Sequence, residues 1–209
     1  MVELVIATSN WGKAKEIKEA LKDLDLEIKT LKEFPFISPP EETGKTFLEN
    51  ALLKAKYYAE KLKRICLADD SGLEVEILNG APGIYSSRFA GEEGNDEKNI
   101  KKLLSLLKDV PLERRKARFV CLMVIVTPKG DYIKAEGIWE GLIGFEPRGR
   151  FGFGYDPIFL VPEYNYQKTA AELPLEIKNK LSHRGKALAK IREILPDFLK
   201  KCQNEGITS

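Results

Sequence analysis

The spacing of hydrophobic residues predicts strands and helices that alternate along the first third of the chain. A short apolar run at residues 2–8 predicts a strand. From residue 13 to residue 24 the apolar positions recur every three or four residues, which predicts a helix with one buried side. Residues 26–31 alternate between apolar and polar and predict a second strand, and the prolines within residues 34–43 predict a loop.

The middle of the chain continues this alternation. Residues 45–63 have helical spacing, with Thr43 as the expected N-cap. A fully apolar run at residues 65–68 predicts a buried strand that ends in the polar residues 69–72. Residues 73–78 then alternate and predict a further strand.

The second half of the chain favours antiparallel pairing. Asn95 or Asp96 is expected to cap a helix. A long strand is predicted over residues 117–127, and the segment 128–131 predicts a hairpin turn into a strand that begins at Tyr132 and extends to Trp139 or on to Ile143.

The last quarter contains a glycine-rich segment and a final helix. Residues 145–157 are expected to be irregular, and a helix is expected to begin near Ser182 and to be interrupted at Pro196. Strands that alternate with helices, followed by hairpins, indicate an α/β fold with a mixed sheet. Because no linker divides the chain, residues 1–209 are predicted to form a single domain.

Composition and charge narrow the function classes. The 34 Lys and Arg residues nearly balance the 32 Asp and Glu residues, which excludes a protein whose whole surface attracts nucleic acid. Hydrophobic residues make up 43% of the chain, enough for a substantial core, but they form no run long enough to span a membrane. The three cysteines are too scattered for a disulfide framework or a zinc site. No signal segment precedes the first strand, so a cytoplasmic protein is expected.

The junction between the first strand and the first helix is a candidate phosphate site. Residues 7–13 form a short polar turn that leads into a helix with a lysine, Lys13. Free N–H groups at a helix start, together with a lysine ammonium, bind phosphate well. The alternative is an ordinary turn capped by Asn10.

Two consecutive carboxylates, Asp69 and Asp70, follow the apolar run. Desolvating them is costly unless a cation or hydrogen-bond donors compensate. Successive side chains on a strand point to opposite faces, so only one of the two is expected to face a given metal. Carboxylate oxygens favour Mg²⁺ or Mn²⁺, and Glu41 and Glu42 are candidates for further ligands. The alternative is a turn with Asp caps.

Two later segments carry groups suited to a nucleotide base. Residues 151–157 combine aromatic rings with glycines, and such a ring can either stack on a base or pack in a turn. His183 and Arg184 open the last helix and can donate to an anion or a carbonyl oxygen, although a lone histidine is usually structural. Lys178 adds a nearby cation. Lys54 on the long helix is expected to be solvated, although it could line the same cleft.

Taken together, these segments resemble one family, the inosine triphosphate pyrophosphatases of the bacterial dITP/XTP diphosphatase type. The matching segments occur in the family's order and cover nearly the full length of the chain. They are residues 7–13, 41–44, 46–47, 49–51, 68–72, 80–86 with 88, 117–119, 152–159, 168–172 and 182–185.

The resemblance implies both a fold and an activity. The fold would be an elongated, two-lobed α/β structure around a central mixed β-sheet flanked by helices, with the nucleotide in a cleft between the lobes. The enzyme would be a homodimer that uses Mg²⁺ to hydrolyse ITP, dITP and XTP to the monophosphate and pyrophosphate. No membrane or nucleic acid polymer would be a partner.

The resemblance also assigns roles to individual residues. Asp70 would be the proton acceptor and a metal ligand, with Glu41 as a second metal ligand. The turn after the first strand would bind the triphosphate, Ser71 would contact the substrate, and the remaining residues would hold the base and its neighbouring groups. The full substrate-binding set is Thr8, Ser9, Asn10, Trp11, Gly12, Lys13, Ser71, Phe153, Gly154, Tyr155, Asp156, Lys178, His183 and Arg184.

Two departures and two alternatives accompany this interpretation. Residues 164–167 look slightly lengthened, as expected for a harmless surface loop. Arg150 and Phe151 stand where the bacterial family usually has Thr-Gly, which could re-aim the base loop. A non-catalytic nucleotide-binding module could use the same segments, but it would not need two carboxylates beside a cation. A pyrophosphatase for other modified nucleotides is the second alternative, and the pair formed by His183 and Arg184 favours 6-oxopurines instead.

Overall fold

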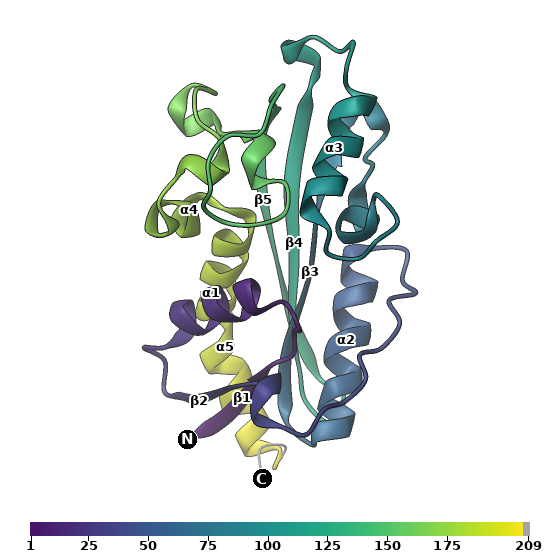
Figure 1. Cartoon of the computed structure of the whole chain (residues 1–209). Helices are drawn as coiled ribbons and strands as arrows, with labels where there is room; N and C mark the ends of the chain where they lie inside the picture. Colours follow the sequence, from purple (N-terminus) through teal and green to yellow (C-terminus); the bar gives the residue numbers. More distant parts are fainter. Residues whose placement is uncertain (207–209) are drawn as a thin grey trace. The chain divides into compact units, whose positions relative to one another are not determined.

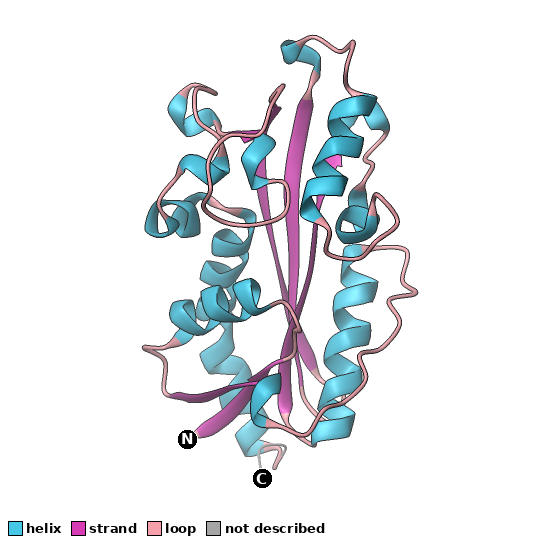
Figure 2. Ribbon diagram, in the orientation of Figure 1, coloured by secondary structure: helices cyan, strands magenta, loops and turns pink. Residues whose placement is uncertain are grey.

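The computed structural model describes residues 1–206 and contains a six-stranded mixed sheet flanked by helices (Figure 2). The strand order is β2-β1-β3-β4-β5-β6. β1 pairs in parallel with β2 and β3, whereas β5 pairs antiparallel with β6, so the predicted α/β class with a mixed sheet is confirmed. The strands are β1 (Val2–Ile6), β2 (Leu26–Thr30), β3 (Ile65–Val75), β4 (Lys116–Val126), β5 (Tyr132–Ile143) and β6 (Phe159–Leu160).

Within residues 1–206, five α-helices accompany the sheet (Figure 1). They are α1 (Trp11–Leu21), α2 (Phe47–Leu62), α3 (Asp96–Leu106), α4 (Leu175–Leu181) and α5 (His183–Asn204). The sequence did not predict α4, because its seven residues are too short for a clear helical period.

The start of α2 corrects the predicted cap. Thr46, and not Thr43, is the N-cap, and its hydroxyl accepts a hydrogen bond from the amide of Glu49 at 3.1 Å. The Glu49 carboxylate reaches back to accept from the amide of Lys45 at 2.6 Å. This reciprocal pattern satisfies two N–H groups at the helix start, and Thr43 has no glutamate three residues later to complete it.

The chain divides into two compact units. The first contains Met1–Asp70, Cys121–Glu136 and the chain from Lys186 onward, and the second contains Ser71–Val120 and Gly137–Gly185. In the first unit, α1 and α5 cover one face of the strands and α2 covers the other (Figure 1). The core on the α1 and α5 side is built from alternate strand residues and one stripe of each helix, including Leu4, Ile6, Ile17, Leu67, Met123 and Ile191.

The second unit has its own core, in which aromatic rings pack against one another among aliphatic residues. Phe119 of β4 lies 4.4 Å from the ring of Phe159, and Trp139 of β5 lies 5.2 Å from the same ring. Leu103 of α3 is fully buried in this cluster. Arg115 is buried beside it and donates to the carbonyls of Leu107, Val110 and Gly144, so a charged group is kept in the interior by three acceptors.

β3 differs from the prediction of two strands separated by a polar turn. It is one continuous strand from Ile65 to Val75, and Asp69 and Asp70 lie within it. A turn is not required, because charged partners compensate the two carboxylates where they lie.

The last helix also differs from the prediction. α5 continues past Pro196 without a break. Leu195, Phe198 and Cys202 lie on both sides of the proline and are all buried in the core of the first unit. This packing holds the helix together although the proline removes one backbone hydrogen bond.

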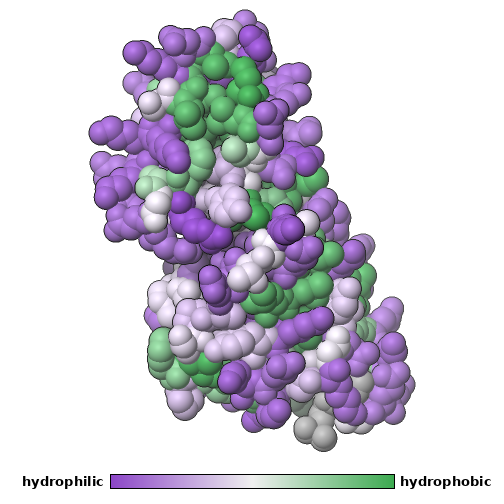
Figure 3. Space-filling view, turned by 90° about the vertical axis from the view of Figure 1, so that its right-hand side faces the viewer, coloured by the Kyte–Doolittle hydropathy of each residue, from purple (hydrophilic) through white to green (hydrophobic). Residues whose placement is uncertain are grey.

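The surface is strongly polar. Figure 3 shows a face on which hydrophilic side chains predominate and apolar ones gather in separate patches. The cysteines Cys66, Cys121 and Cys202 are buried and carry free thiols. None of the helices within residues 1–206 is long and apolar enough to cross a membrane.

The continuity of α5 can be tested by truncating Phe198, which lies beyond Pro196. Removing this buried ring should lower the free energy of unfolding by about 3–5 kcal/mol, because the lost burial adds to the cost of a cavity. Lys200→Ala, an exposed position on the same helix, should change it by less than about 0.5 kcal/mol. Urea denaturation gives both values, and equal small losses would show that the helix beyond Pro196 is not packed.

Candidate nucleotide-binding and catalytic residues

The turn after β1 has the geometry of an anion-binding helix start. The side chain of Asn10 caps α1 by accepting a hydrogen bond from the amide of Lys13 at 3.2 Å. The hydroxyl of Thr8 accepts from the amide of Asn10 at 3.1 Å. α1 begins at Trp11, two residues before the predicted start, and Ser9, Asn10, Trp11 and Gly12 are exposed. The helix start and its N–H groups therefore face solvent, where a phosphate can reach them.

Lys13 forms an ion pair with a buried carboxylate. Its ammonium lies 3.3 Å from Oδ2 of Asp69, whose side chain is only 1% exposed. The thiol of Cys121 lies 3.8 Å from the same oxygen and donates a weak hydrogen bond. Asp69 therefore holds Lys13 at the start of α1.

Asp70 follows Asp69 in β3. Successive strand side chains point to opposite faces, and that only one of the two carboxylates faces a given metal stays a prediction. Asp70 is 8% exposed. Its Oδ2 has no hydrogen-bond partner among residues 1–206, which is costly for a buried carboxylate oxygen.

The charges around Asp70 form a coupled set. Burial raises the pKa of Asp70 to about 6; Lys54 and Lys13 act against this rise, while Glu42 and Asp69 add to it. For Lys54, burial opposes the charged form, but the carboxylates of Asp69, Glu42 and Asp70 outweigh burial and raise the pKa. Lys54 is thus a partner of the carboxylates and not the solvated lysine that the sequence predicted.

The loop before α2 brings a glutamate to this set. Glu42 forms an ion pair with Lys54 at 2.8 Å, whereas Glu41 is exposed. The amide of Gly44 donates to the buried side chain of Asn50 at 2.8 Å. A Cβ at Gly44 would lie 2.5 Å from that oxygen, so a glycine is needed to fix the loop against α2. Of the two glutamates, Glu42 is the one that acts on Asp70.

The carboxylates suit a divalent cation that is bound together with a nucleotide. Within residues 1–206, no three His, Cys, Asp or Glu side chains are grouped to hold a metal by themselves. Mg²⁺ needs no such group at nucleotide sites, because one or two carboxylates act with phosphate oxygens and water. The unsatisfied Oδ2 of Asp70 is a suitable ligand atom for such an ion.

In the second unit, Phe153 lies among cationic side chains. The Lys178 ammonium is 4.9 Å from the centre of the Phe153 ring, and the Arg184 guanidinium is 5.2 Å from it. Arg184 also donates to the hydroxyl of Ser71 at 3.1 Å. Four of the predicted substrate-binding residues therefore lie together, although they come from β3, the glycine-rich loop, α4 and α5.

A buried ion pair supports the glycine-rich loop. Lys178 contacts Oδ2 of Asp156 at 2.5 Å, and both side chains are almost fully buried. The same oxygen accepts the amide of Phe153 at 3.1 Å. Gly152 has φ +76°, and a Cβ there would lie 2.1 Å from that oxygen, so only glycine fits. The loop is therefore fixed by Asp156 from within.

The start of α5 and Tyr155 of the glycine-rich loop are also held by buried residues. His183 is buried and stacks on Phe119 with ring centres 4.7 Å apart. Gly185 lets α5 begin against α4, because a Cβ there would lie 1.7 Å from the carbonyl oxygen of Asn179. Tyr155 is buried and donates its hydroxyl to the carbonyl of Ser86 at 2.7 Å.

The departure from the family pattern lies on the surface of the second unit. The amides of Arg150 and Phe151 donate to the carbonyl of Ala171 at 3.1 Å and 2.9 Å. Phe151 is 45% exposed, and its ring lies 5.9 Å from the Arg150 guanidinium. The ring that contacts Lys178 is that of Phe153 and not of Phe151.

The predicted residues thus form two groups. The first unit carries the turn after β1, Glu41 and Asp70, and the second carries Ser71, Phe153–Asp156, Lys178, His183 and Arg184. The chain passes from one group to the other at the peptide bond between Asp70 and Ser71 in β3. The ion pair between Glu42 and Lys54 was not predicted from the sequence. The 12-residue separation of the pair leaves no local signal for it.

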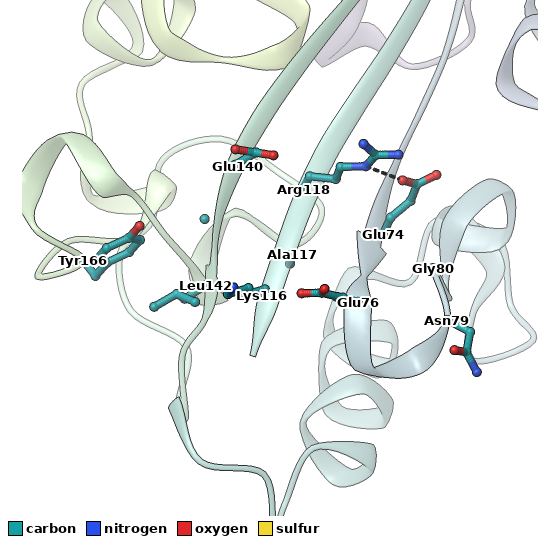
Figure 4. Close-up of a pocket in the computed structure, with 11 residues that line it drawn as sticks. Glu74, Glu76, Asn79, Gly80, Lys116, Ala117, Arg118, Glu140, Leu142 and Tyr166 are labelled. Atoms are coloured by element: carbon teal, nitrogen blue, oxygen red, sulfur yellow. Dashed lines mark hydrogen bonds and ion pairs between the residues drawn. The ribbon is translucent and has the colours of Figure 1, made fainter. Parts of the chain in front are cut away.

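A separate groove in the second unit contains none of the predicted residues. Its volume is about 650 Å³. Figure 4 shows Glu74 of β3, Arg118 of β4 and Glu140 of β5 along it, with an ion pair between Arg118 and Glu74. Because its charges are of both signs, the groove lacks the excess of cations that a triphosphate requires.

Comparison with known protein families identifies the family to which the chain belongs. Residues 4–194 match the Ham1 family, and the chain therefore belongs to this family. A Ham1 protein from Coxiella burnetii has a similar structure, with a TM-score of 0.85 and 43% identity, over 94% of this chain and all of that one. The Staphylococcus aureus Ham1 protein gives 0.82 and 42%, over 93% of this chain and 98% of that one.

Relatives with curated names are more similar still in sequence. A protein of Bacillus cereus named dITP/XTP pyrophosphatase is 49% identical over 200 residues, which cover 95% of this chain and 97% of that protein. A protein of Desulforamulus reducens with the same name is 53% identical over 194 residues, covering 93% and 96%. The resemblance inferred from the motifs is thereby confirmed.

The electrostatic environment of Asp70 leads to a prediction about stability. Its pKa in the folded protein, about 6, lies above the ordinary value of 3.8, so the folded state binds this proton more tightly than the unfolded state does. The stabilisation of the folded protein by the proton on Asp70 is complete below pH 4 and is lost as the pH rises through 6. With a chelator present, Asp70→Asn should raise the free energy of unfolding by about 1–3 kcal/mol at pH 8 and change it little at pH 4.

Asp23→Asn is the matched control, because the carboxylate of Asp23 affects the pH dependence of stability with the opposite sign. The bidentate hydrogen bond from Arg192 lowers the pKa of Asp23 to about 2, so this carboxylate stabilises the folded state above its unfolded pKa and loses the effect as the pH falls. Urea denaturation across the pH range measures both variants. An Asp70→Asn variant that is less stable than the wild type at pH 8 would contradict the proposed cost of burying this charge.

Proposed function

We propose that the chain is a nucleoside triphosphate pyrophosphatase that hydrolyses ITP, dITP and XTP to the monophosphate and pyrophosphate. The observation that carries the proposal is the identity of about 50% with proteins named dITP/XTP pyrophosphatase over almost the whole chain. It is supported by the unsatisfied carboxylate of Asp70 beside Lys13 and Lys54. In this role the enzyme removes deaminated purine nucleotides from the nucleotide pool.

The residues of the first unit bind the triphosphate and activate water. The exposed start of α1 and Lys13 contact phosphate oxygens, where negative charge accumulates in the transition state. Asp70 accepts the proton of the attacking water. An ordinary aspartate is a weak base, and burial raises the pKa of Asp70 to about 6 when no cation is bound.

Mg²⁺ is the proposed cofactor. Asp70 would hold it together with Glu41 or Glu42, and the structure favours Glu42 because its charge acts on Asp70 whereas Glu41 is exposed. When bound, the ion supplies positive charge to the phosphate oxygens and lowers the pKa of water. Lys54, paired with Glu42 at 2.8 Å, positions the glutamate for this task.

The residues of the second unit bind the base. The Phe153 ring offers a face for stacking, and Arg184 and Lys178 are donors close to that ring. Hypoxanthine and xanthine carry an oxygen at C6, which accepts a hydrogen bond from Arg184. Adenine carries an amino group there, so a donor would meet a donor and buried polar groups would be left unpaired.

The proposal also includes the oligomeric state of the protein and its location in the cell. We expect a homodimer, as the family resemblance implies, and a cytoplasmic enzyme. The three buried free thiols suit a reducing compartment.

The activity is tested by pyrophosphate release from ITP, dITP, XTP, dGTP, dTTP and ATP, with and without Mg²⁺. We expect release from the first three, only in the presence of the ion. Asp70→Asn should reduce kcat by about a hundredfold or more, since it removes the base and a metal ligand together.

The outcomes separate the alternatives. Tight ITP binding without pyrophosphate release would indicate a non-catalytic nucleotide-binding module. Faster hydrolysis of a modified pyrimidine or methylated nucleotide would indicate the related pyrophosphatase. Near-normal turnover by Asp70→Asn would remove Asp70 from its assigned role even if the activity itself is found.

Selectivity gives a second functional prediction. Arg184→Ala should lower kcat/KM for ITP by roughly ten- to a hundredfold more than it lowers kcat/KM for ATP, because only the 6-oxopurine uses the donor. Steady-state kinetics with both nucleotides measure this difference. Lys186→Ala, a nearby lysine on the same helix, serves as the charge control, and equal losses for ITP and ATP would rule out a base-reading role for Arg184.

A further inference from the structure

The loop that carries Phe153 is attached at two neighbouring amides. The Phe153 amide donates to Asp156, which belongs to the loop itself. The next amide, that of Gly154, donates to Oδ2 of Asp96 at 2.8 Å. Asp96 is the first residue of α3 and lies 58 positions earlier in the chain. It is therefore the attachment that ties this part of the loop to another element.

The helix that carries Asp96 is itself well supported. Asn95 caps α3 by accepting the amide of Lys98 at 3.0 Å, so the cap does not depend on Asp96. Asn99 is buried, donates to the carbonyl of Ser87 at 3.0 Å and accepts the amide of Ala90 at 2.8 Å. α3 can thus serve as a fixed support for the loop.

Asp156 holds the Phe153 amide, and the Gly154 peptide that follows needs a support of its own because a glycine backbone is permissive. Gly152 and Gly154 both have positive φ, +76° and +62°, and glycine loses more conformational freedom than other residues when it is held in one conformation. Tyr155, the next residue, is anchored in the core, which leaves the Phe153–Gly154 peptide as the part that Asp96 restrains.

A groove of about 550 Å³ lies beside the loop, lined by Ile100 and Leu104 from α3 and by Phe151 and Phe153 from the loop. Asp96 and Gly154 also line this groove, and their hydrogen bond joins the loop to α3 there.

We propose that Asp96 is a positioning residue for the nucleotide base, acting through Gly154 to keep the Phe153 ring beside Lys178 and Arg184. This inference rests on the proposed function, since it assigns the ring to the base of the substrate. The carboxylate fixes the Gly154 peptide, and the peptide fixes the adjacent ring. Losing the anchor weakens substrate binding and leaves the chemistry at Asp70 unchanged.

The test compares Asp96→Ala, Asp96→Asn and Glu97→Ala. Glu97→Ala is the matched control, because it removes the same charge from the same helical turn, whereas Gly154 donates to Asp96. Asp96→Asn removes the charge but keeps an oxygen that can accept the amide. Asp96→Ser, which suits a helix start, replaces Asp96→Ala if that variant fails to fold.

Two measurements are made on the full chain. Hydrogen exchange at the Gly154 amide, without nucleotide, should be faster in Asp96→Ala and close to wild type in the other two variants. KM for ITP should rise roughly three- to thirtyfold in Asp96→Ala, as expected for a charge-assisted hydrogen bond near the surface, with kcat within about twofold. Asp96→Asn should recover most of the KM.

The proposal fails if Gly154 exchange is unchanged in Asp96→Ala. It also fails if Glu97→Ala raises KM equally, which would indicate an effect of charge alone, or if kcat falls while KM stays the same. A wild-type protein that does not hydrolyse ITP would overturn the proposed function instead. Exchange still decides in that case whether Asp96 anchors the loop, and calorimetric titration with IMP decides whether the anchor affects binding of the base.

Discussion

The structure depends on two consecutive carboxylates buried in one continuous strand. Asp69 and Asp70 are 1% and 8% exposed, and neither can stay charged in the interior without compensation. Asp69 forms an ion pair with Lys13 of α1, while Asp70 experiences the charges of Lys54, Lys13, Glu42 and Asp69. One carboxylate thus holds a cation, and the other keeps an oxygen available for a ligand.

The second unit solves a similar problem with a buried ion pair. Lys178 and Asp156 neutralise each other, and the same aspartate oxygen holds the Phe153 amide. Removing either partner would leave an uncompensated charge in the core. The ion pair therefore fixes Lys178 beside the Phe153 ring and also fixes the conformation of the loop that carries this ring.

Asp70 and the pair of Lys178 and Asp156 are charged groups in positions where burial lowers the stability of the folded protein. Asp70 raises the free energy of the folded state when it is ionised, which is typical of groups at functional sites. The turn after β1 and the start of α5 are less costly, because unpaired N–H groups exist at every helix start. Membership in the Ham1 family is consistent with this division between a buried carboxylate that lowers stability and helix starts that do not.

The sequence alone determined the α/β class, most strands, the helix start near Asn10 and the family, because hydrophobic period, capping residues and ordered motifs are local signals. It failed where long-range contacts override local chemistry. β3 continues through Asp69 and Asp70 because lysines from two helices compensate them, and α5 continues past Pro196 because buried residues on both sides hold it. Only the tertiary structure paired Lys54 with Glu42 and Gly154 with Asp96, since the partners lie far apart in sequence and nothing in their local patterns links them.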